Sequence, residues 1–263
     1  MEDARELSRR QFGAHAERYV SSRDHQSSES LDRLLALAAP KSDWNVLDIA
    51  TGGGHTALAL APHVRHVVAS DLTREMLEAA ERFIRGKGVE NVSFREADAC
   101  ALPFEDASFD LVACRVAPHH FADVRAFVRE CARVVRLGGT VVVIDNVTPE
   151  DPAASDAINE IERTRDPSHQ RAYDEREWIS FFDEASLRVE RVEHFRKRRE
   201  FEFWAGMQGV TDDVKERLRA LFRSLPPGAK TALAPEEREG RLYFYLDEIL
   251  ILSRSTAPPA SRP

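Results

Sequence analysis

The sequence has few cysteines and no long hydrophobic run. Cys100, Cys114 and Cys131 lie in apolar contexts without C-x-x-C spacing, so we expect buried, reduced thiols and neither a disulfide nor a bound metal. No apolar run is long enough to span a bilayer. The charged opening segment, MEDARELSRRQFG, lacks the apolar centre of a signal peptide. These absences predict a soluble, cytoplasmic protein.

The sequence also lacks an excess of basic residues. Its formal net charge is −8, with acids and bases mixed along the chain, whereas binding to a nucleic-acid backbone needs a basic face. The one dense basic run, residues 196–199 (RKRR), is interpreted as a solvated strand end. Motifs of DNA-methylating enzymes are missing too: there is no NPPY-like tetrapeptide, and Cys114 has no Pro-Cys context. We therefore predict no nucleic-acid partner.

What the sequence does contain is an alternation of apolar runs with helical periodicity. The predicted strands are residues 45–49, 65–71, 91–98, 109–115 and 140–146. The predicted helices span 28–39 or begin near 55, 73 and 124, and the last of them is ended by Gly138 and Gly139. Strands that alternate with helices indicate βαβ units around a parallel sheet.

The texture changes after residue 146. A polar, largely helical segment precedes predicted strands at 186–195 and 241–254. A plain hairpin between those strands would need only about 2–5 residues, so the much longer insertion is predicted to build a substrate cap with the segment after residue 146. The predicted organisation is a lid segment at 1–27, a core at 28–146, cap segments with two sheet-completing strands at 147–253, and a disordered tail at 254–263.

A glycine-rich turn follows the first predicted strand, in VLDIATGGGHTA at 46–57. Gly52-x-Gly54-x-x-Ala57 fits the dinucleotide fingerprint, so NAD is one candidate ligand. Asp48 argues against a pyrophosphate, because two anions would share a small volume. It favours a ligand with a cationic amino group, such as S-adenosylmethionine, which Gly52 and Gly54 allow to approach the backbone closely.

Acids end three successive strands at the same edge of the predicted sheet. Asp48 belongs to the first, Asp71 to the second and Asp98 to the third. Asp71 can accept hydrogen bonds from both ribose hydroxyls, a device that NAD enzymes share. Asp98, with the amide of Ala99, can read the edge of an adenine. The three acids and the glycine turn together predict a ligand site at this edge.

These motifs resemble a known family. VLDIATGGGHTA, VVASDLTREMLEAA, ADACALPFEDASFDLVACR and ARVVRLGG look like successive motifs of class I S-adenosylmethionine-dependent methyltransferases. The nearest branch contains ubiquinone/menaquinone-biosynthesis C-methyltransferases and related small-molecule enzymes. The resemblance covers residues 44–146 and is most specific at 102–110; Ala50 replaces the first glycine of the superfamily, and Leu137 replaces a usual proline. It implies an α/β fold, with a doubly wound, seven-stranded Rossmann-like sheet, an antiparallel last strand and a helical cap.

The resemblance also implies which residues bind the cofactor S-adenosylmethionine. Asp48, Ala50, Gly52 and Gly54 would hold the methionine part, Asp71, Leu72 and Met76 the ribose and neighbouring adenine face, and Asp98 and Ala99 the adenine, with Arg115 near the methionyl end and Tyr19 closing over the cofactor.

Methyl transfer needs alignment and exclusion of water above all, and a base only if the acceptor must lose a proton. His119 and His120 follow the fourth strand, where a histidine can deprotonate a hydroxyl or an acidic carbon; the alternative is that they simply pack. Candidate substrate-binding residues are Asp145, Asn146, Arg165, His169 and Arg171.

The predicted function is methyl transfer to a small-molecule acceptor, with carbon or oxygen favoured over nitrogen. An NAD(P)-dependent dehydrogenase and a non-catalytic S-adenosylmethionine-binding relative stay open as alternatives. The oligomeric state, monomer or homodimer, is also left open.

Overall fold

The computed structural model describes residues 4–13 and 29–256. In this part of the chain eight strands form one sheet, in the order β3-β2-β1-β4-β5-β8-β6, and β7 pairs with β8 alone. The strands are β1 (Asn45–Ile49), β2 (His66–Asp71), β3 (Val92–Glu96), β4 (Phe109–Arg115), β5 (Val135–Asn146), β6 (Leu187–Glu200), β7 (Glu236–Arg238) and β8 (Arg241–Ser255). Strands β1 to β5 are parallel, and β8 runs antiparallel to both β5 and β6. The predicted doubly wound sheet with an antiparallel last strand is confirmed, with short β7 added to the seven predicted strands.

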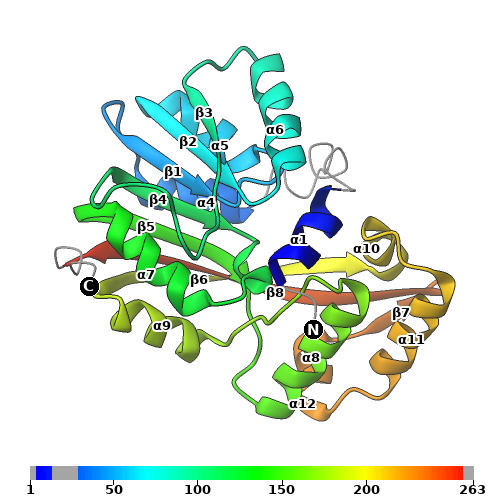
Figure 1. Cartoon of the computed structure of the whole chain (residues 1–263). Helices are drawn as coiled ribbons and strands as arrows, with labels where there is room; N and C mark the ends of the chain where they lie inside the picture. The colour runs from blue at the N-terminus through cyan, green and yellow to red at the C-terminus, as the bar shows by residue number, and fades with distance from the viewer. Residues whose placement is uncertain (1–3, 14–28, 257–263) are drawn as a thin grey trace.

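Helices cover both faces of this sheet (Figure 1). They are α1 (Ala4–Gly13), α4 (Glu29–Ala38), α5 (His55–Leu60), α6 (Arg74–Gly86), α7 (Val124–Val134), α8 (Pro152–Arg165), α9 (Glu175–Glu184), α10 (Phe201–Met207), α11 (Asp212–Arg223) and α12 (Pro227–Leu233), with 3₁₀ turns η1 (Ala61–His63) and η2 (Pro118–His120). The apolar residues of α4, α5 and α6 pack on one face of the sheet, and those of α7 and α9 pack on the other. The carboxyl edge of the parallel strands stays open between these layers.

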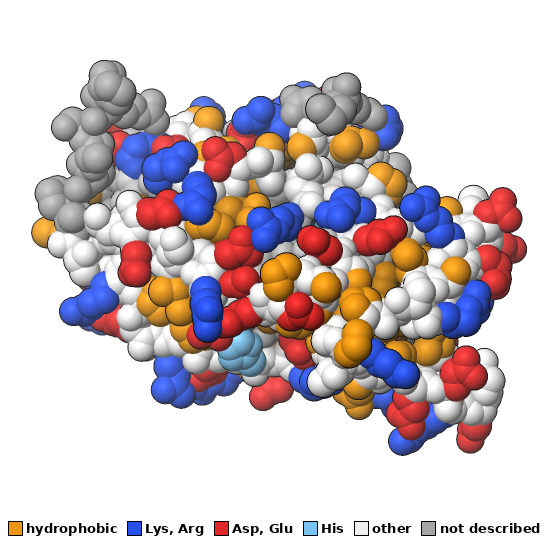
Figure 2. Space-filling model, turned by 90° about the horizontal axis from the view of Figure 1, so that it is seen from below, with side chains coloured by type: hydrophobic (Ala, Val, Ile, Leu, Met, Phe, Trp, Pro, Cys, Tyr) orange, Lys and Arg blue, Asp and Glu red, His pale blue; other side chains and the backbone are white. Residues whose placement is uncertain are grey.

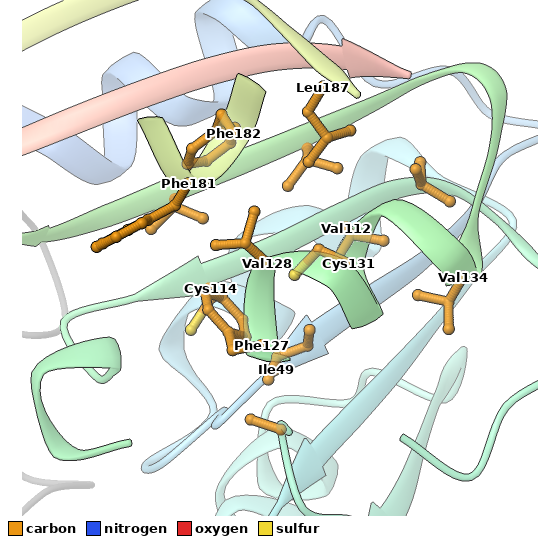
Figure 3. Close-up of a cluster of buried hydrophobic side chains, with 14 of the residues drawn as sticks. Ile49, Val112, Cys114, Phe127, Val128, Cys131, Val134, Phe181, Phe182 and Leu187 are labelled. Atoms are coloured by element: carbon orange, nitrogen blue, oxygen red, sulfur yellow. The ribbon is translucent and has the colours of Figure 1, made fainter. Parts of the chain in front are cut away.

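Side chains alternate along each strand and so divide the core into two halves. In β1, Val46 belongs to the cluster under α4, α5 and α6, whereas Leu47 belongs to the cluster under α7 and α9. Figure 3 shows the second cluster, where Phe127 of α7 and Phe182 of α9 point toward the sheet. Burying each such side chain contributes about 1.5–3 kcal/mol, which fixes the strand ends that carry the polar residues of the site.

Two of the three cysteines are part of this core. Cys114 and Cys131 are free and buried, and both appear among the apolar side chains of Figure 3. Burial raises the pKa of both thiols well above the usual value, which keeps them protonated and unreactive. Cys100 differs from the prediction, because it is only half-buried.

A third apolar cluster lies beyond the central sheet. The far ends of β6 and β8 extend past β5 and carry α8, α10, α11 and α12 (Figure 1). Trp204, Phe222 and Phe244 pack ring against ring at its centre. Helix α9 lies in the predicted cap segment but packs on the sheet with α7.

Several predicted boundaries differ from the structure, including those of α7 and β8. Helix α7 ends at Val134, so Gly138 and Gly139 lie inside β5 and do not stop the helix. They occupy an irregular stretch opposite Asp110, where a Cβ on Gly139 would lie 3.0 Å from the Asp110 carbonyl oxygen and 2.7 Å from Val135 Cγ2. Strand β8 continues to Ser255, into the segment predicted as a tail.

Helix α1 lies in the middle of the molecule, between α6 and α10 (Figure 1). Phe12 packs against Met76 of α6. On the other side, Gln11 Nε2 donates to Gln208 Oε1 at 2.9 Å, just after α10. Helix α1 therefore connects the core to the cap, and Tyr19 of the same predicted lid lies outside the described residues.

Acidic and basic side chains are interspersed on the face of the molecule shown in Figure 2. That face offers no continuous basic surface of the kind that nucleic-acid binding requires. No helix in the described ranges combines the length and apolar content needed to cross a membrane.

Candidate active site

The glycine turn after β1 is built on left-handed backbone. Ala50 has φ +52°, Gly52 φ +54° and Gly54 φ +83°. A Cβ on Gly54 would lie 2.9 Å from Ile84 Cδ1, so this glycine lets α6 pack against the turn. Gly54 was predicted to contact the methionine part of the cofactor, but it does not line the cavity that the turn helps to form.

This first cavity lies at the carboxyl edge of the sheet and has a volume of about 1010 Å³, including the part open to solvent. The predicted cofactor residues that line it are Ala50, Gly52, Asp71, Leu72, Met76, Asp98, Ala99 and Arg115. Residues from the ends of four strands thus meet in one place, because parallel strands end at the same edge.

Asp71 joins two loops at the floor of the cavity. Its Oδ2 accepts a hydrogen bond from the Gly52 amide at 3.0 Å, and its Oδ1 accepts one from the Thr73 amide at 2.9 Å. Burial raises the pKa of Asp71 above its usual value, although these amide hydrogen bonds oppose the shift. A carboxylate has about four acceptor positions, so Asp71 can also serve hydroxyl groups of a ligand.

Asp48 lies beneath the turn and outside the cavity lining. It is 1% exposed, and its Oδ2 accepts a hydrogen bond from Thr51 Oγ1 at 2.6 Å. Burial raises the pKa of Asp48 to about 7. Because this carboxyl resists ionisation, a cationic ligand group above the turn would stabilise its charged form.

Helix α1, which belongs to the predicted lid segment, closes one side of the first cavity. Arg5, Ser8 and Phe12 line the cavity, and Arg5 Nε lies 2.6 Å from Asp98 Oδ2. Their spacing of three and four residues places them on one helical face, which is the sequence signal that could have found them.

A second cavity of about 850 Å³ adjoins the first. The two share the lining residues Phe12, Arg115, Val116 and His120. Arg115 Nε donates to Thr56 Oγ1 at 3.0 Å. Val116 has φ +55°, which is rare for a β-branched residue and marks stored strain, a feature that often occurs at functional sites.

His119 lies in the wall of the second cavity and is paired with Asp145. Their Nδ1 and Oδ1 atoms are 2.5 Å apart, and the two side chains are 5% and 0% exposed. Burial alone would lower the pKa of His119, but the charge and hydrogen bond of Asp145 outweigh it, so the pKa is raised. Since Nδ1 is bonded to the carboxylate, Nε2 is left to exchange protons.

His120 has a different environment from its neighbour. Its Nδ1 lies 3.1 Å from Ser168 Oγ, and its ring meets that of Phe12 edge to face at 4.9 Å. Burial and the charge of His119 lower the pKa of His120 to about 3. It is therefore neutral at physiological pH and forms part of the wall between the cavities.

The predicted substrate residues divide into three groups. Asn146 and Arg165 line the second cavity, whereas Asp145 and His169 lie behind its wall. His169 Nε2 bonds Asn159 Oδ1 at 2.8 Å. Arg171 faces neither cavity, because its guanidinium pairs with Glu177 at 2.7 Å on the surface.

The cap contributes lining residues that the sequence analysis missed. These are Lys197, Arg199, Phe203, Trp204, Met207, Gln208, Leu246 and Glu248. The interpretation of residues 196–199 as a solvated strand end is wrong for Lys197 and Arg199. Strand β6 continues to Glu200 because it pairs with β8 as far as Tyr243, so alternate side chains of the basic run face the cavity.

No cluster of three or more His, Cys, Asp or Glu is arranged to hold a metal ion within residues 4–13 and 29–256. The three neighbouring histidines instead bond Asp145, Ser168 and Asn159.

A doubly wound sheet with an antiparallel last strand, and a cavity at its carboxyl edge lined by a glycine turn and two strand-end acids, define a Rossmann-like nucleoside-binding protein. Comparisons with known proteins narrow this class. Residues 47–143 match the family model described as a methyltransferase domain.

Relatives match the chain over most of its length or over less than half of it. An uncharacterized methyltransferase of Bacillus subtilis, YcgJ, is 38% identical over 207 residues, which are 79% of this chain and 82% of that protein. The crystal structure of YcgJ has a TM-score of 0.84 at 35% identity, covering 87% of this chain and 98% of that chain. A demethylmenaquinone methyltransferase of Thermus thermophilus is 40% identical over 119 residues, or 44% of this chain and 54% of that protein.

The chain therefore belongs to the methyltransferase domain family, and the resemblance to class I S-adenosylmethionine-dependent methyltransferases is confirmed. This membership leaves the dehydrogenase alternative without support.

Proposed function

We propose that the protein methylates a small molecule bound in the second cavity, at a carbon or oxygen atom, with S-adenosylmethionine bound in the first. The observation that carries the proposal is the shared wall: Phe12, Arg115, Val116 and His120 line both cavities. These shared residues mark where the two cavities meet, which is where in-line transfer would bring the methyl group of one ligand into contact with the acceptor atom of the other; alignment of the two ligands is the main contribution to its rate.

The residues of the first cavity fit S-adenosylmethionine. Asp71 and Leu72 would hold the ribose, Asp98 and Ala99 the adenine, and Ala50 and Gly52 the methionine part. Buried Asp48 would balance the cationic amino group, in keeping with its raised pKa. When bound, the cofactor supplies a methyl group already activated on a sulfonium.

His119 is the general base of the proposal. With Asp145 accepting from Nδ1, Nε2 would take a proton from a hydroxyl or an acidic carbon of the acceptor, and the Asp145 carboxylate would stabilise the imidazolium that forms. His120, whose pKa is low, would shape the wall. The chain is similar over part of its length to demethylmenaquinone methyltransferases. This similarity agrees with an acceptor that presents a hydroxyl or an acidic carbon.

We further propose that residues 1–27 act as a lid through α1, and that α8, α10, α11 and α12 act as the cap. Both would exclude water from the transfer, because Arg5, Ser8 and Phe12 close the first cavity while Phe203 and Trp204 close the second.

The test is a screen of small phenols, enols and amines for acceptor-dependent formation of S-adenosylhomocysteine by the full chain. An Arg171→Gln variant serves as the control, since Arg171 faces neither cavity. The proposal expects turnover with at least one phenol or enol in both proteins, and turnover of amines alone would contradict transfer to carbon or oxygen. Tight binding of S-adenosylhomocysteine with no turnover on any acceptor would favour a non-catalytic relative.

A further inference from the structure

We propose that the acceptor carries an anionic group, a carboxylate or a phosphate, and that Arg165, Lys197 and Arg199 bind it. This inference rests on the proposed function in one respect, namely that the acceptor occupies the second cavity. It adds the chemical class of the acceptor: a small molecule with an apolar or aromatic body and one anionic end.

The charges that line the cavity are unbalanced. Arg115, Arg165, Lys197 and Arg199 all line it, and among the described residues that do so Glu248 is the one acid. Glu248 is 2% exposed; it pairs with Lys197, and Ser30 Oγ donates to its Oε2 at 3.0 Å. One acid thus stands against four cationic side chains.

The acids that pair with Lys197 and Arg165 are more deeply buried than the cations. In the Lys197–Glu248 pair the two side chains are 20% and 2% exposed, and in the Arg165–Glu162 pair they are 14% and 3% exposed. The cation of each pair is therefore the more exposed member; Glu162 does not line the cavity, whereas Glu248 does. Asp166, also buried, interacts with Arg165 and His120. The cations are therefore more accessible to a ligand than the acids that pair with them.

Arg165 is held in a fixed orientation. Its guanidinium stacks on the Trp204 ring, 4.6 Å from the centroid, and its Nη2 donates to Glu162 Oε2 at 2.9 Å. A guanidinium has five N–H donors in a planar fork, and this bond uses one of them. A preorganised fork of this kind suits carboxylate and phosphate oxygens.

Lys197 and Arg199 reach the cavity because they are two residues apart on β6. Their neighbours Arg196 and Arg198 face away and lie over Tyr245 and Tyr243, at 4.6 and 4.0 Å from the ring centroids. The strand thus separates four consecutive basic residues into a cavity pair and a surface pair. This separation supplies matched controls for the two cavity cations of β6.

The rest of the lining indicates the body of the ligand. Phe12, Phe203, Trp204, Met207 and Leu246 line the same cavity. Aromatic and thioether side chains favour a flat or apolar group. The anionic end would lie toward the cations on α8 and β6.

The experiment titrates benzoate, phenyl phosphate and neutral benzamide into the full chain by calorimetry, with and without S-adenosylhomocysteine. Variants Arg199→Gln and Arg165→Gln remove one cavity cation each. Arg198→Gln on β6 and Arg163→Gln on α8 make the same change at exposed positions outside the cavity. Melting temperatures verify that each variant is folded.

We expect at least one of the two anions to bind tenfold or more tightly than benzamide. At least one cavity variant should lose tenfold or more of that affinity, while both controls keep it. Absence of binding by both anions, equal binding of benzamide, or equal losses in cavity and control variants would overturn the inference. If the unaltered protein binds the anions but does not bind S-adenosylhomocysteine, the proposed function is contradicted instead.

Discussion

His119 Nδ1 lies 2.5 Å from Asp145 Oδ1; both side chains are buried, His119 in the wall of the second cavity and Asp145 behind it. His119 follows the end of β4, and Asp145 lies near the end of β5. These two strand ends are neighbours because β4 and β5 are paired and parallel. A carboxylate that holds one nitrogen of a histidine fixes both its orientation and its basicity. This pair therefore makes the proposed base testable in two ways.

The first prediction concerns the base itself. On a confirmed acceptor that must lose a proton, His119→Asn should lower kcat by roughly 10²–10⁴, with the affinity for S-adenosylhomocysteine nearly unchanged. His120→Asn should cost far less, because a histidine with a pKa of about 3 is a weak base. If kcat falls less than tenfold, and by the same factor, in both variants, neither histidine is the general base.

The same pair predicts a pH dependence. Because the pKa of His119 is raised, its free-base form and the rate should increase as the pH rises through that pKa. Asp145→Asn removes the charge that raises the pKa, so the rising limb of the kcat profile should move to lower pH while kcat falls. If the rising limb of the kcat profile stays at the same pH in this variant, the group that titrates is not His119.

Asp48 predicts pH-dependent cofactor affinity. Its pKa is about 7 in the ligand-free protein. Below that pH, binding of a cationic amino group must therefore be accompanied by release of the Asp48 proton. Affinity for S-adenosylhomocysteine should therefore rise by up to about tenfold per pH unit below pH ~7 and level off above it. Calorimetry from pH ~5.5 to ~8.5 measures this slope, which Asp48→Asn should flatten.

The same residue predicts a stability effect of opposite sign. When folding raises the pKa of a carboxyl, the folded protein loses stability as the pH rises from the unfolded pKa of that group through its folded pKa. Asp48→Asn should thus raise the free energy of unfolding at pH ~8, by an amount of the order of 2–4 kcal/mol, and by less at pH ~5. Denaturant unfolding at both values verifies it; an equal change at both would show that burial of the charge is not the cause.

Asp71 should contribute most to ribose binding. Asp71→Ala should weaken the binding of S-adenosylmethionine by ~10–100-fold, or about 1.4–2.8 kcal/mol. Because Asp71 also accepts from the amides of Gly52 and Thr73, the melting temperature should fall as well. Asp71→Asn, which keeps one acceptor oxygen, should lie between the two proteins; unchanged affinity in the folded Ala variant would remove Asp71 from the site.

The lid predicts a change in hydrogen exchange. Amide exchange across residues 10–27 should slow when S-adenosylhomocysteine binds, because Arg5, Ser8 and Phe12 line the cofactor cavity. Phe12→Ala removes the ring contact with His120 and should reduce this protection, whereas Arg9→Ala on the exposed face of α1 should not. Exchange that is the same with and without ligand would count against a lid.

The sequence predicts the sheet well because each buried strand is a short apolar run that can be recognised from its own residues. Strands β1 and β4 have the predicted bounds, since apolar runs ended by polar residues leave little freedom. The continuation of β6 to Glu200 is different: polar residues there are extended only because β8 pairs with them. Pairing across the sheet is not encoded in a local pattern, so the cavity side of Lys197 and Arg199 was missed.

The site shows the same division. Strand ends and glycines place Asp71 and Asp98 at one edge by a general rule of parallel sheets. The bond between His119 and Asp145, by contrast, joins residues 26 apart through the register of two strands. The positive φ of Val116 is also invisible in the sequence, because the surrounding fold imposes it against the preference of the residue.

The most direct test of the account is a comparison of Michaelis constants in two variants with one confirmed acceptor. Asp71→Ala alters the first cavity, and Phe203→Ala removes an exposed ring that lines only the second. The account predicts that Asp71→Ala raises the KM of S-adenosylmethionine by ~10–100-fold and leaves that of the acceptor nearly unchanged, and that Phe203→Ala does the reverse. If both variants raise the same KM, the two cavities do not hold separate substrates and the account is contradicted.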